Sequence, residues 1–169
     1  MKVSDFVNEF LTKHGIKFVF ELSGGMITHM LDSLNVAKTI KIISMKHEQS
    51  AAFAADAVGR LTGKPGVAMA TSGPGATNLI TGIGSSFFDS SPTLFITGQV
   101  NRNELKQSRP IRQLGFQETD IVSITQFLTK ASWQIKNEKE VPIILEKAFN
   151  LSMYQRKGPV LVDIPMDIQ

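Results

Sequence analysis

Short apolar segments alternate with amphipathic segments along almost the whole chain, and this alternation limits the fold more than any other feature. Runs of β-branched and aliphatic residues have the length of buried strands at residues 16–20, 39–44, 67–70, 93–97, 132–135 and 160–164. Helical patterns or helix-start signals occur over residues 3–13, 26–34, 48–61, 77–88, 120–127 and from Pro142 onward. Strands that alternate with helices predict a parallel sheet. We therefore predict one α/β domain over residues 1–169, a doubly wound, mostly parallel six-stranded sheet with helices on both faces.

Composition excludes several classes of protein. The chain has no cysteine, which removes disulfides and thiolate chemistry, and its net charge of +3 is too mild and too scattered for a nucleic-acid-binding stripe. No segment approaches the roughly 20 apolar residues that span a membrane. Asp5 and Glu9 interrupt any signal-peptide core near the N-terminus. We expect a cytoplasmic protein with no nucleic-acid or membrane partner.

Three segments with glycine or charged residues come directly after predicted strands. They are Ser23-Gly24-Gly25, Lys46-His47-Glu48 and Thr71–Gly75. Ligands of parallel sheets bind at the carboxyl ends of the strands, which meet at one edge. We therefore expect any functional site to be built from these three segments.

Glu48 begins a predicted helix with an unusually small face, formed by Ala51, Ala52, Ala55 and Gly59. An acid in the first turn of a helix is favoured by the helix dipole, by about 0.3–1 kcal/mol, so a solvated glutamate is the simplest interpretation. Its place at a strand end favours a functional role instead. The small face requires a close neighbour, either a partner helix or a ligand.

The segment Thr71–Asn78 has the glycines of a phosphate-binding turn at a helix start, yet it matches neither the P-loop nor the dinucleotide fingerprint. A tight strand-to-helix turn, with Pro74 in the first helical turn, is the alternative. The three histidines His14, His29 and His47 lack metal-ligand spacing, and no Gly-x-Ser-x-Gly elbow occurs. Hydrolase, zinc-enzyme and nucleotide-kinase interpretations therefore have no residues to support them.

Seven segments, in order along the chain, resemble the N-terminal pyrimidine-binding domain of thiamine-diphosphate-dependent enzymes, and within that family the acetolactate synthase large subunit group. They are Ser23-Gly24-Gly25, His47–Ala52, Ala57–Gly66, Thr71–Asn78, Ile96–Val100, Phe116–Glu118 and Gly158–Pro165. Each segment alone is a weak signal. Their common order over essentially the whole chain is a specific one.

The resemblance implies a role for each candidate site residue. Glu48 matches the catalytic glutamate of the family, which bonds to the N1′ nitrogen of the cofactor's aminopyrimidine and shares a proton with it. The substrate class implied is a 2-oxo acid, which is decarboxylated and joined to an acceptor. The cofactor-binding residues implied are Gly25, Glu48, Ser72, Pro74 and Asn78, with Phe116 and Gln117 on the substrate side.

The family's magnesium and diphosphate signature has no match in this chain. We therefore expect magnesium to be bound by a domain absent from these residues, and FAD is possible in a full-length protein. The chain is then a domain of a longer protein or half of a split enzyme, and inactive alone. The family also implies a homodimer or homotetramer with the active site between subunits. The small-residue helix and the Pro74-Gly75-Ala76 helix are the expected subunit contacts.

Two departures from the family concern the substrate. Met166 stands where relatives usually carry lysine, and Ser23 where they carry proline. The irregular segment 98–117 contains a basic loop, residues 101–112, that is either a solvated surface or an anion-attracting rim.

Three alternative functions remain for the chain. The first is a sibling thiamine-diphosphate decarboxylase, oxidase or sugar-modifying enzyme, and the second is a non-catalytic regulatory or interaction domain. The third, and least favoured, is a generic nucleotide-binding domain.

Overall fold

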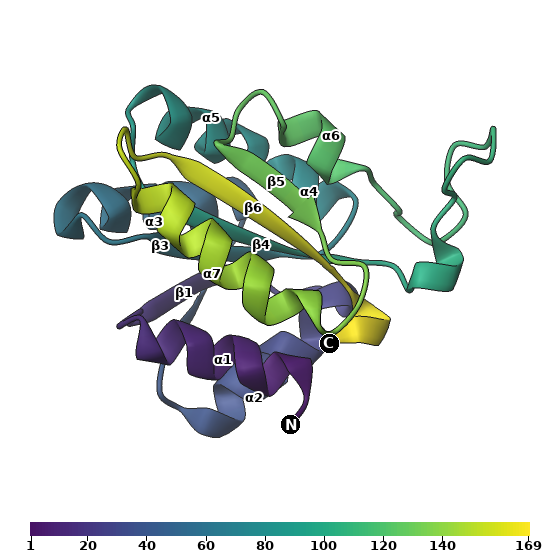
Figure 1. The fold of residues 1–169 in the computed structure, drawn as a ribbon, viewed down its shortest axis with the longest axis horizontal. Coiled ribbons are helices and arrows are strands. Elements are labelled where there is room, and N and C mark those ends of the chain that lie inside the picture. The colour runs from purple at the N-terminus through teal and green to yellow at the C-terminus, as the bar shows by residue number, and fades with distance from the viewer.

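The computed structural model describes all 169 residues, which form one sheet of six strands (Figure 1). Its strands are β1 (Phe18–Leu22), β2 (Lys41–Ser44), β3 (Gly66–Ala70), β4 (Thr93–Gln99), β5 (Ala131–Gln134) and β6 (Pro159–Pro165). Their order across the sheet is β2-β1-β3-β4-β6-β5, and every neighbouring pair is parallel. The predicted α/β sheet is confirmed, and it is parallel throughout.

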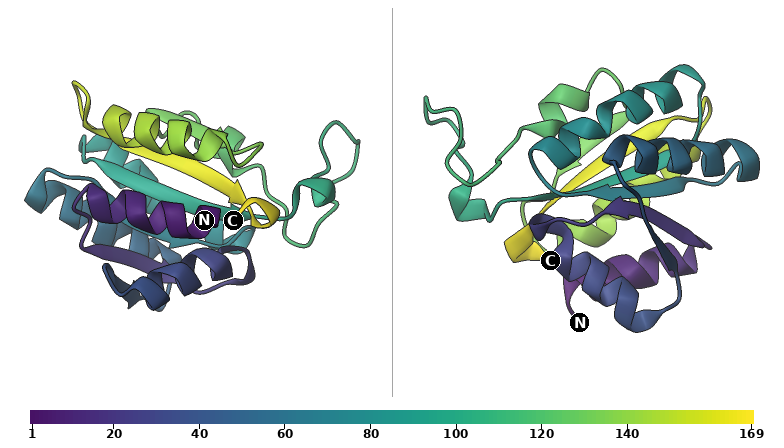
Figure 2. Two further views of the ribbon diagram at one scale, coloured as in Figure 1. Left: turned by 60° about the horizontal axis from the view of Figure 1, so that its bottom comes forward. Right: turned by 180° about the vertical axis from the view of Figure 1, so that it is seen from behind.

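Helices cover both faces of the sheet, as predicted (Figures 1 and 2). One face is covered by α1 (Val3–Lys13), α2 (Thr28–Ala37) and α7 (Glu140–Met153). The other is covered by α3 (Glu48–Thr62), α4 (Pro74–Asn78), α5 (Ile80–Phe88) and α6 (Ile121–Thr125). Short 3₁₀ turns lie at Gly25–Ile27, Arg102–Glu104 and Met166–Ile168. No helix has both the length and the apolar character needed to cross a bilayer.

The two faces of the sheet have cores of different bulk. Along β3, Val67 and Met69 face α1, α2 and α7, while Ala68 and Ala70 face α3 and α5. Successive residues of a strand point to opposite faces, so this alternation follows directly from the sequence. The alanines allow helices to approach the second face closely.

The small face of α3 is buried within this chain, which corrects its predicted role as a subunit contact. Ala51, Ala52 and Ala55 have no exposed surface. A Cβ on Gly82 of α5 would lie 2.3 Å from the Cβ of Ala52, and one on Gly66 of β3 would lie 1.9 Å from the carbonyl oxygen of Ala55. The neighbours that require small residues are therefore α5 and β3. In the Pro74-Gly75-Ala76 turn only Pro74 is exposed.

Several predicted boundaries differ from the structure by about two residues, for local reasons. The first strand begins at Phe18 rather than residue 16, because the N–H of Ile16 bonds to the carbonyl of Leu11 and the N–H of Gly15 to that of Thr12. This is a Schellman ending, with Gly15 in the left-handed conformation at φ 75°. The predicted helix 77–88 is divided into α4 and α5 and begins earlier, at Pro74.

Connections leave the carboxyl ends of neighbouring strands β1 and β3 toward opposite faces. The chain passes from β1 to α2 on one face and from β3 to α4 on the other. Such a point, where the winding of a doubly wound sheet reverses, is where ligands bind. Segment 101–118 projects from the same edge of the sheet (Figures 1 and 2).

Candidate functional site

Glu48 lies at the carboxyl edge of the sheet as the first residue of α3. The helix is capped by His47, whose Nδ1 accepts a hydrogen bond from the Gln49 N–H at 3.1 Å. Although the histidine is exposed, Glu48 is buried, with 7% of its surface accessible. The interpretation of Glu48 as a solvated first-turn acid is therefore wrong, and the carboxylate needs a polar partner.

Only one of the two carboxylate oxygens of Glu48 has a hydrogen-bond partner in the chain. Asn78, at the end of α4, donates from Nδ2 to Oε2 at 2.9 Å, and no protein group donates to Oε1. Gly75 keeps the space beside Oε1 open, since a Cβ there would lie 3.3 Å from that oxygen and 2.8 Å from Cγ2 of Thr71. Unlike the unpaired Oγ of Ser72, Oε1 of Glu48 is not fully buried, so it reaches the surface of the chain and is available to a ligand group.

The ends of β1 and β3 meet at Gly24 and Thr71. A Cβ on Gly24 would lie 2.4 Å from Cβ of Thr71, and the N–H of Met26 donates to Oγ1 of Thr71 at 3.2 Å. Gly25, which lies between Gly24 and Met26 in the sequence, is exposed, and a Cβ there would meet no atom within 4 Å. Gly24 is therefore required for packing between the strand ends, whereas Gly25 leaves an open surface.

The turn after β3 brings the loop that contains Phe116 and Gln117 next to α4. Gly73 has φ 64°, and a Cβ there would lie 2.6 Å from Cβ of Gln117. Ser72, just before it, is buried, and its Oγ has no hydrogen-bond partner. Phe116 is 74% exposed on the outside of the loop. Sequence segments about 40 residues apart thus meet beside the helix that holds Asn78.

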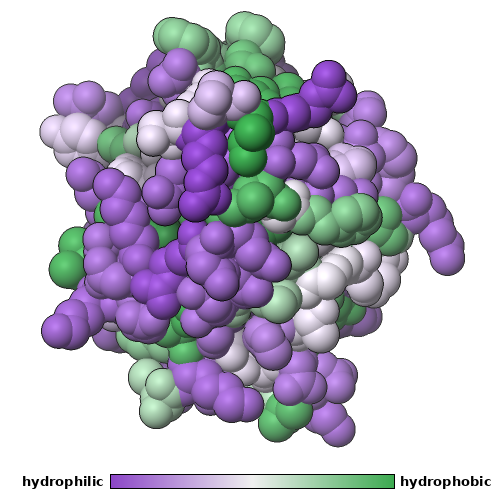
Figure 3. All heavy atoms as spheres, turned by 90° about the vertical axis from the view of Figure 1, so that its right-hand side faces the viewer, coloured by the Kyte–Doolittle hydropathy of each residue, from purple (hydrophilic) through white to green (hydrophobic).

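The structure gathers most of the predicted site residues at one edge of the sheet. Glu48 and Asn78 are in direct contact, and Gln117 lies against the turn that leads to Asn78. Ser72 and Pro74 belong to that turn, Gly25 lies on the neighbouring strand end, and Phe116 forms the outer rim. Figure 3 looks onto this edge and shows hydrophobic and near-neutral residues gathered together among hydrophilic ones. No group of three or more histidine, aspartate or glutamate side chains could hold a metal ion.

One cation of the basic loop forms ion pairs with the rest of the domain, and three others form no ion pair. Arg102 donates from Nε to Asp167 at 2.7 Å and pairs with Glu138 at 3.3 Å. Lys106, Arg109 and Arg112 have no carboxylate partner. The loop therefore presents free positive charge near the candidate site.

A buried polar cluster around Asp163 escaped the sequence analysis. Asp163, on β6, is 1% exposed and accepts hydrogen bonds from Thr97 at 2.7 Å and from Gln99 and Gln134 at 3.1 Å each. Burial raises the pKa of Asp163 to about 6, although these three hydrogen bonds act in the opposite direction. In the sequence, the charged residue Asp163 inside the apolar run Val160–Ile164 is the feature that could have indicated this cluster.

Replacing Asp163 by asparagine is expected to change how stability depends on pH. The raised pKa means that the folded state holds the proton more tightly, so stability falls as pH rises from the ordinary carboxyl value of 3.8 to about 6. The variant lacks this titration. Its free energy of unfolding relative to wild type should therefore rise by on the order of 3 kcal/mol between pH 4 and pH 7. Urea denaturation at both pH values measures the difference, and a constant difference would contradict the prediction.

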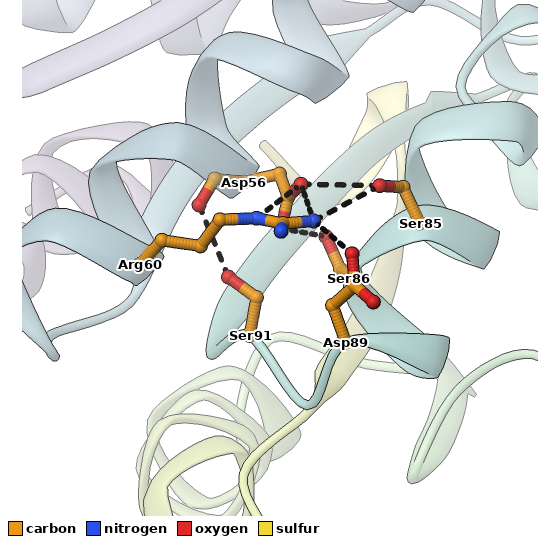
Figure 4. Close-up of polar contacts among 6 residues, drawn as sticks. All are labelled: Asp56, Arg60, Ser85, Ser86, Asp89 and Ser91. Atoms are coloured by element: carbon orange, nitrogen blue, oxygen red, sulfur yellow. Dashed lines mark hydrogen bonds and ion pairs between the residues drawn. The ribbon is translucent and has the colours of Figure 1, made fainter.

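Another buried carboxylate, Asp56, joins α3 to α5 (Figure 4). Its Oδ2 accepts from Arg60 Nε at 2.9 Å and Nη2 at 2.7 Å, and Oδ1 accepts from Ser86 at 3.2 Å. Burial is the largest single influence and would raise the pKa of Asp56, but the hydrogen bonds and positive charge of Arg60, together with serine hydroxyls, outweigh it and the pKa is lowered. Arg60 also pairs with Asp89 at 2.5 Å. Because its charges are paired within the chain, this cluster is structural.

Comparison with known proteins supports the family resemblance. Residues 1–124 match the family described as thiamine pyrophosphate enzyme, N-terminal TPP binding domain. The chain is 42% identical to the chloroplastic acetolactate synthase of Arabidopsis thaliana over 99% of its own length. It is 45% identical to the acetolactate synthase of Arthrospira platensis and 43% identical to the acetolactate synthase large subunit of Parasynechococcus marenigrum, over 94% of its length in each case. The aligned residues span 24–27% of these relatives.

Proposed function

The chain belongs to the family of thiamine pyrophosphate enzyme N-terminal domains, and on this premise we propose that it is the pyrimidine-binding domain of an enzyme acting on 2-oxo acids. The reaction proposed is the decarboxylation and carboligation implied by the name acetolactate synthase, which its relatives carry. We propose that residues 1–169 form this domain and that it needs the rest of the enzyme for activity. Magnesium, and FAD where one is used, would be held by other segments.

The observation that carries the proposal is the unpartnered Oε1 of Glu48. Glu48 is buried as a residue, but its Oε1 has no protein donor and reaches the surface of the chain, which suits a ring nitrogen that shares a proton with it. Asn78 fixes the other oxygen, so the carboxylate cannot rotate freely. Gly75 leaves room beside Oε1, and the unpaired Oγ of Ser72 is a further polar group at the same turn. These residues therefore fit the aminopyrimidine of thiamine diphosphate.

Thiamine diphosphate, when bound, supplies the electron sink for breaking a bond next to a carbonyl carbon. The role of this chain is to hold and move a proton at Oε1 of Glu48. Gln117 and Phe116 would line the substrate side, close to the turn at Gly73. The free charges of Lys106, Arg109 and Arg112 favour an anionic substrate, which a 2-oxo acid is.

The proposed assembly is a homodimer or homotetramer. The buried small face of α3 cannot form the contact, so we assign it to the outer surfaces of α3 and α5. Phe53, Leu61 and Phe88 are exposed there, by 40%, 86% and 69%. Exposed apolar side chains of this size on adjacent helices are typical of an interface.

The decisive test uses the full-length protein with thiamine diphosphate, magnesium and pyruvate. Carbon dioxide release with formation of acetolactate or acetoin would support the proposal. Cofactor binding without pyruvate turnover would instead indicate a sibling decarboxylase or oxidase with another substrate. An absence of cofactor binding would contradict the proposal and favour a non-catalytic domain.

A further inference from the structure

The side-chain amide of Gln99 forms hydrogen bonds through both of its N–H groups and through its oxygen. Nε2 donates to Oδ2 of Asp163 at 3.1 Å and to the main-chain carbonyl of Thr119 at 2.8 Å. Oε1 accepts from the N–H of Val100 at 3.0 Å. Reversing the amide would place its oxygen against two acceptors, so these contacts fix its orientation. Asp163, as the acceptor of one N–H, directs the other toward Thr119.

This amide is a direct link between the sheet and the loop that carries Phe116 and Gln117. Thr119 lies two residues after Gln117, whose Cβ lies against Gly73. The Gly73 turn in turn begins α4, which ends at Asn78, the partner of Glu48. A contiguous set of contacts therefore runs from Asp163 to the candidate site.

We propose that Asp163 acts through Gln99 as a positioning residue, which holds segment Gly115–Thr119 against the Gly73 turn beside Glu48. The effect on catalysis rests on the proposed function, whereas the effect on the loop does not. Asp163 needs no contact with a substrate for this role. It needs only to accept a hydrogen bond.

Gln134 provides a matched control, because it donates to the same Oδ2 of Asp163 at the same distance of 3.1 Å. It makes no hydrogen bond to the loop. Gln99→Met and Gln134→Met therefore each remove one hydrogen bond to Asp163, with little change in side-chain volume. Only the first also releases the carbonyl of Thr119 and the N–H of Val100.

Hydrogen exchange at the loop amides can be measured without any knowledge of the reaction. The N–H of Gly115 bonds to the carbonyl of Glu104 at 2.8 Å, and that of Glu118 to the carbonyl of Gly115 at 3.2 Å. In the full-length protein, hydrogen exchange at these two amides should be roughly tenfold faster in Gln99→Met than in wild type or Gln134→Met. Gln99→Met should also lower thermal stability more than Gln134→Met, because it removes three hydrogen bonds rather than one.

The kinetic measurement is the substrate dependence of turnover in the same proteins. Gln99→Met should raise the KM for the 2-oxo acid roughly tenfold, with a smaller effect on kcat, because the loop is proposed to line the substrate side. Asp163→Asn keeps an oxygen acceptor for Gln99 and should retain both loop protection and KM. Asp163→Leu removes the acceptor and should behave like Gln99→Met.

The outcomes separate this inference from the proposed function. Equal loop exchange in Gln99→Met and Gln134→Met would overturn the positioning role, as would loop release in Asp163→Asn equal to that in Asp163→Leu. A wild-type protein without thiamine-dependent turnover would contradict the proposed function alone. In that case the hydrogen-exchange comparison still decides whether Asp163 positions the loop.

Discussion

Replacing Glu48 by glutamine is expected to lower thiamine-diphosphate-dependent turnover by at least about 100-fold, the usual scale for losing a positioned acid–base group. Glutamine has the size of glutamate, and its oxygen can still accept the hydrogen bond of Asn78. It cannot exchange a proton, and it would place an amide where Oε1 now has no protein partner. The initial rate of carbon dioxide release from pyruvate by the full-length protein measures the effect.

Asn78→Ala is the matched control for this experiment. It removes the donor to Oε2 of Glu48 but leaves the carboxylate able to exchange a proton. We therefore expect a smaller loss of turnover than in Glu48→Gln, with both variants retaining the wild-type circular dichroism spectrum. Unchanged turnover in Glu48→Gln would refute the proposed catalytic role of this residue and favour the non-catalytic domain.

The sheet could be predicted because its strands are short, apolar and separated by helical patterns. The runs Val67–Ala70 and Thr93–Thr97 are buried on both sides, and burial on both faces removes any need for polar alternation. Boundaries were less accurate where the first or last turn depends on backbone hydrogen bonds, as at Gly15. The order of strands, and hence the meeting of β1 and β3 at Thr71, required the structure.

Local pattern alone could not show which neighbour an unusual residue contacts. Ala52 and Gly59 correctly indicated that something approaches α3, yet that neighbour is the chain's own core rather than a second subunit. Gln99 lay within a recognised motif, but its link to Thr119 spans 20 residues and depends on tertiary folding. Contacts of this kind leave no periodic signal in a sequence.

Replacing Arg60 by alanine should destabilise the protein by about 3 kcal/mol at pH 7, because it leaves the buried carboxylate of Asp56 without its cation (Figure 4). The Arg60 guanidinium makes two hydrogen bonds to Asp56, and the hydroxyls of Ser85 and Ser86 would remain as the only side-chain donors. Neutral hydroxyls stabilise a carboxylate less than a guanidinium does. Urea denaturation of wild type and variant measures the free energy of unfolding.

Two comparisons distinguish the buried ion pair from the exposed one. Asp89→Ala removes the other partner of Arg60, whose side chain is 53% exposed, and should cost no more than about 1 kcal/mol. The lowered pKa of Asp56 means that its stabilisation is present above the unfolded carboxyl pKa of about 3.9 and is lost as pH falls further. The difference between wild type and Arg60→Ala should therefore shrink below pH 4. Equal costs for Arg60→Ala and Asp89→Ala at pH 7 would show that the buried pair of Arg60 with Asp56 contributes no more to stability than the exposed pair with Asp89.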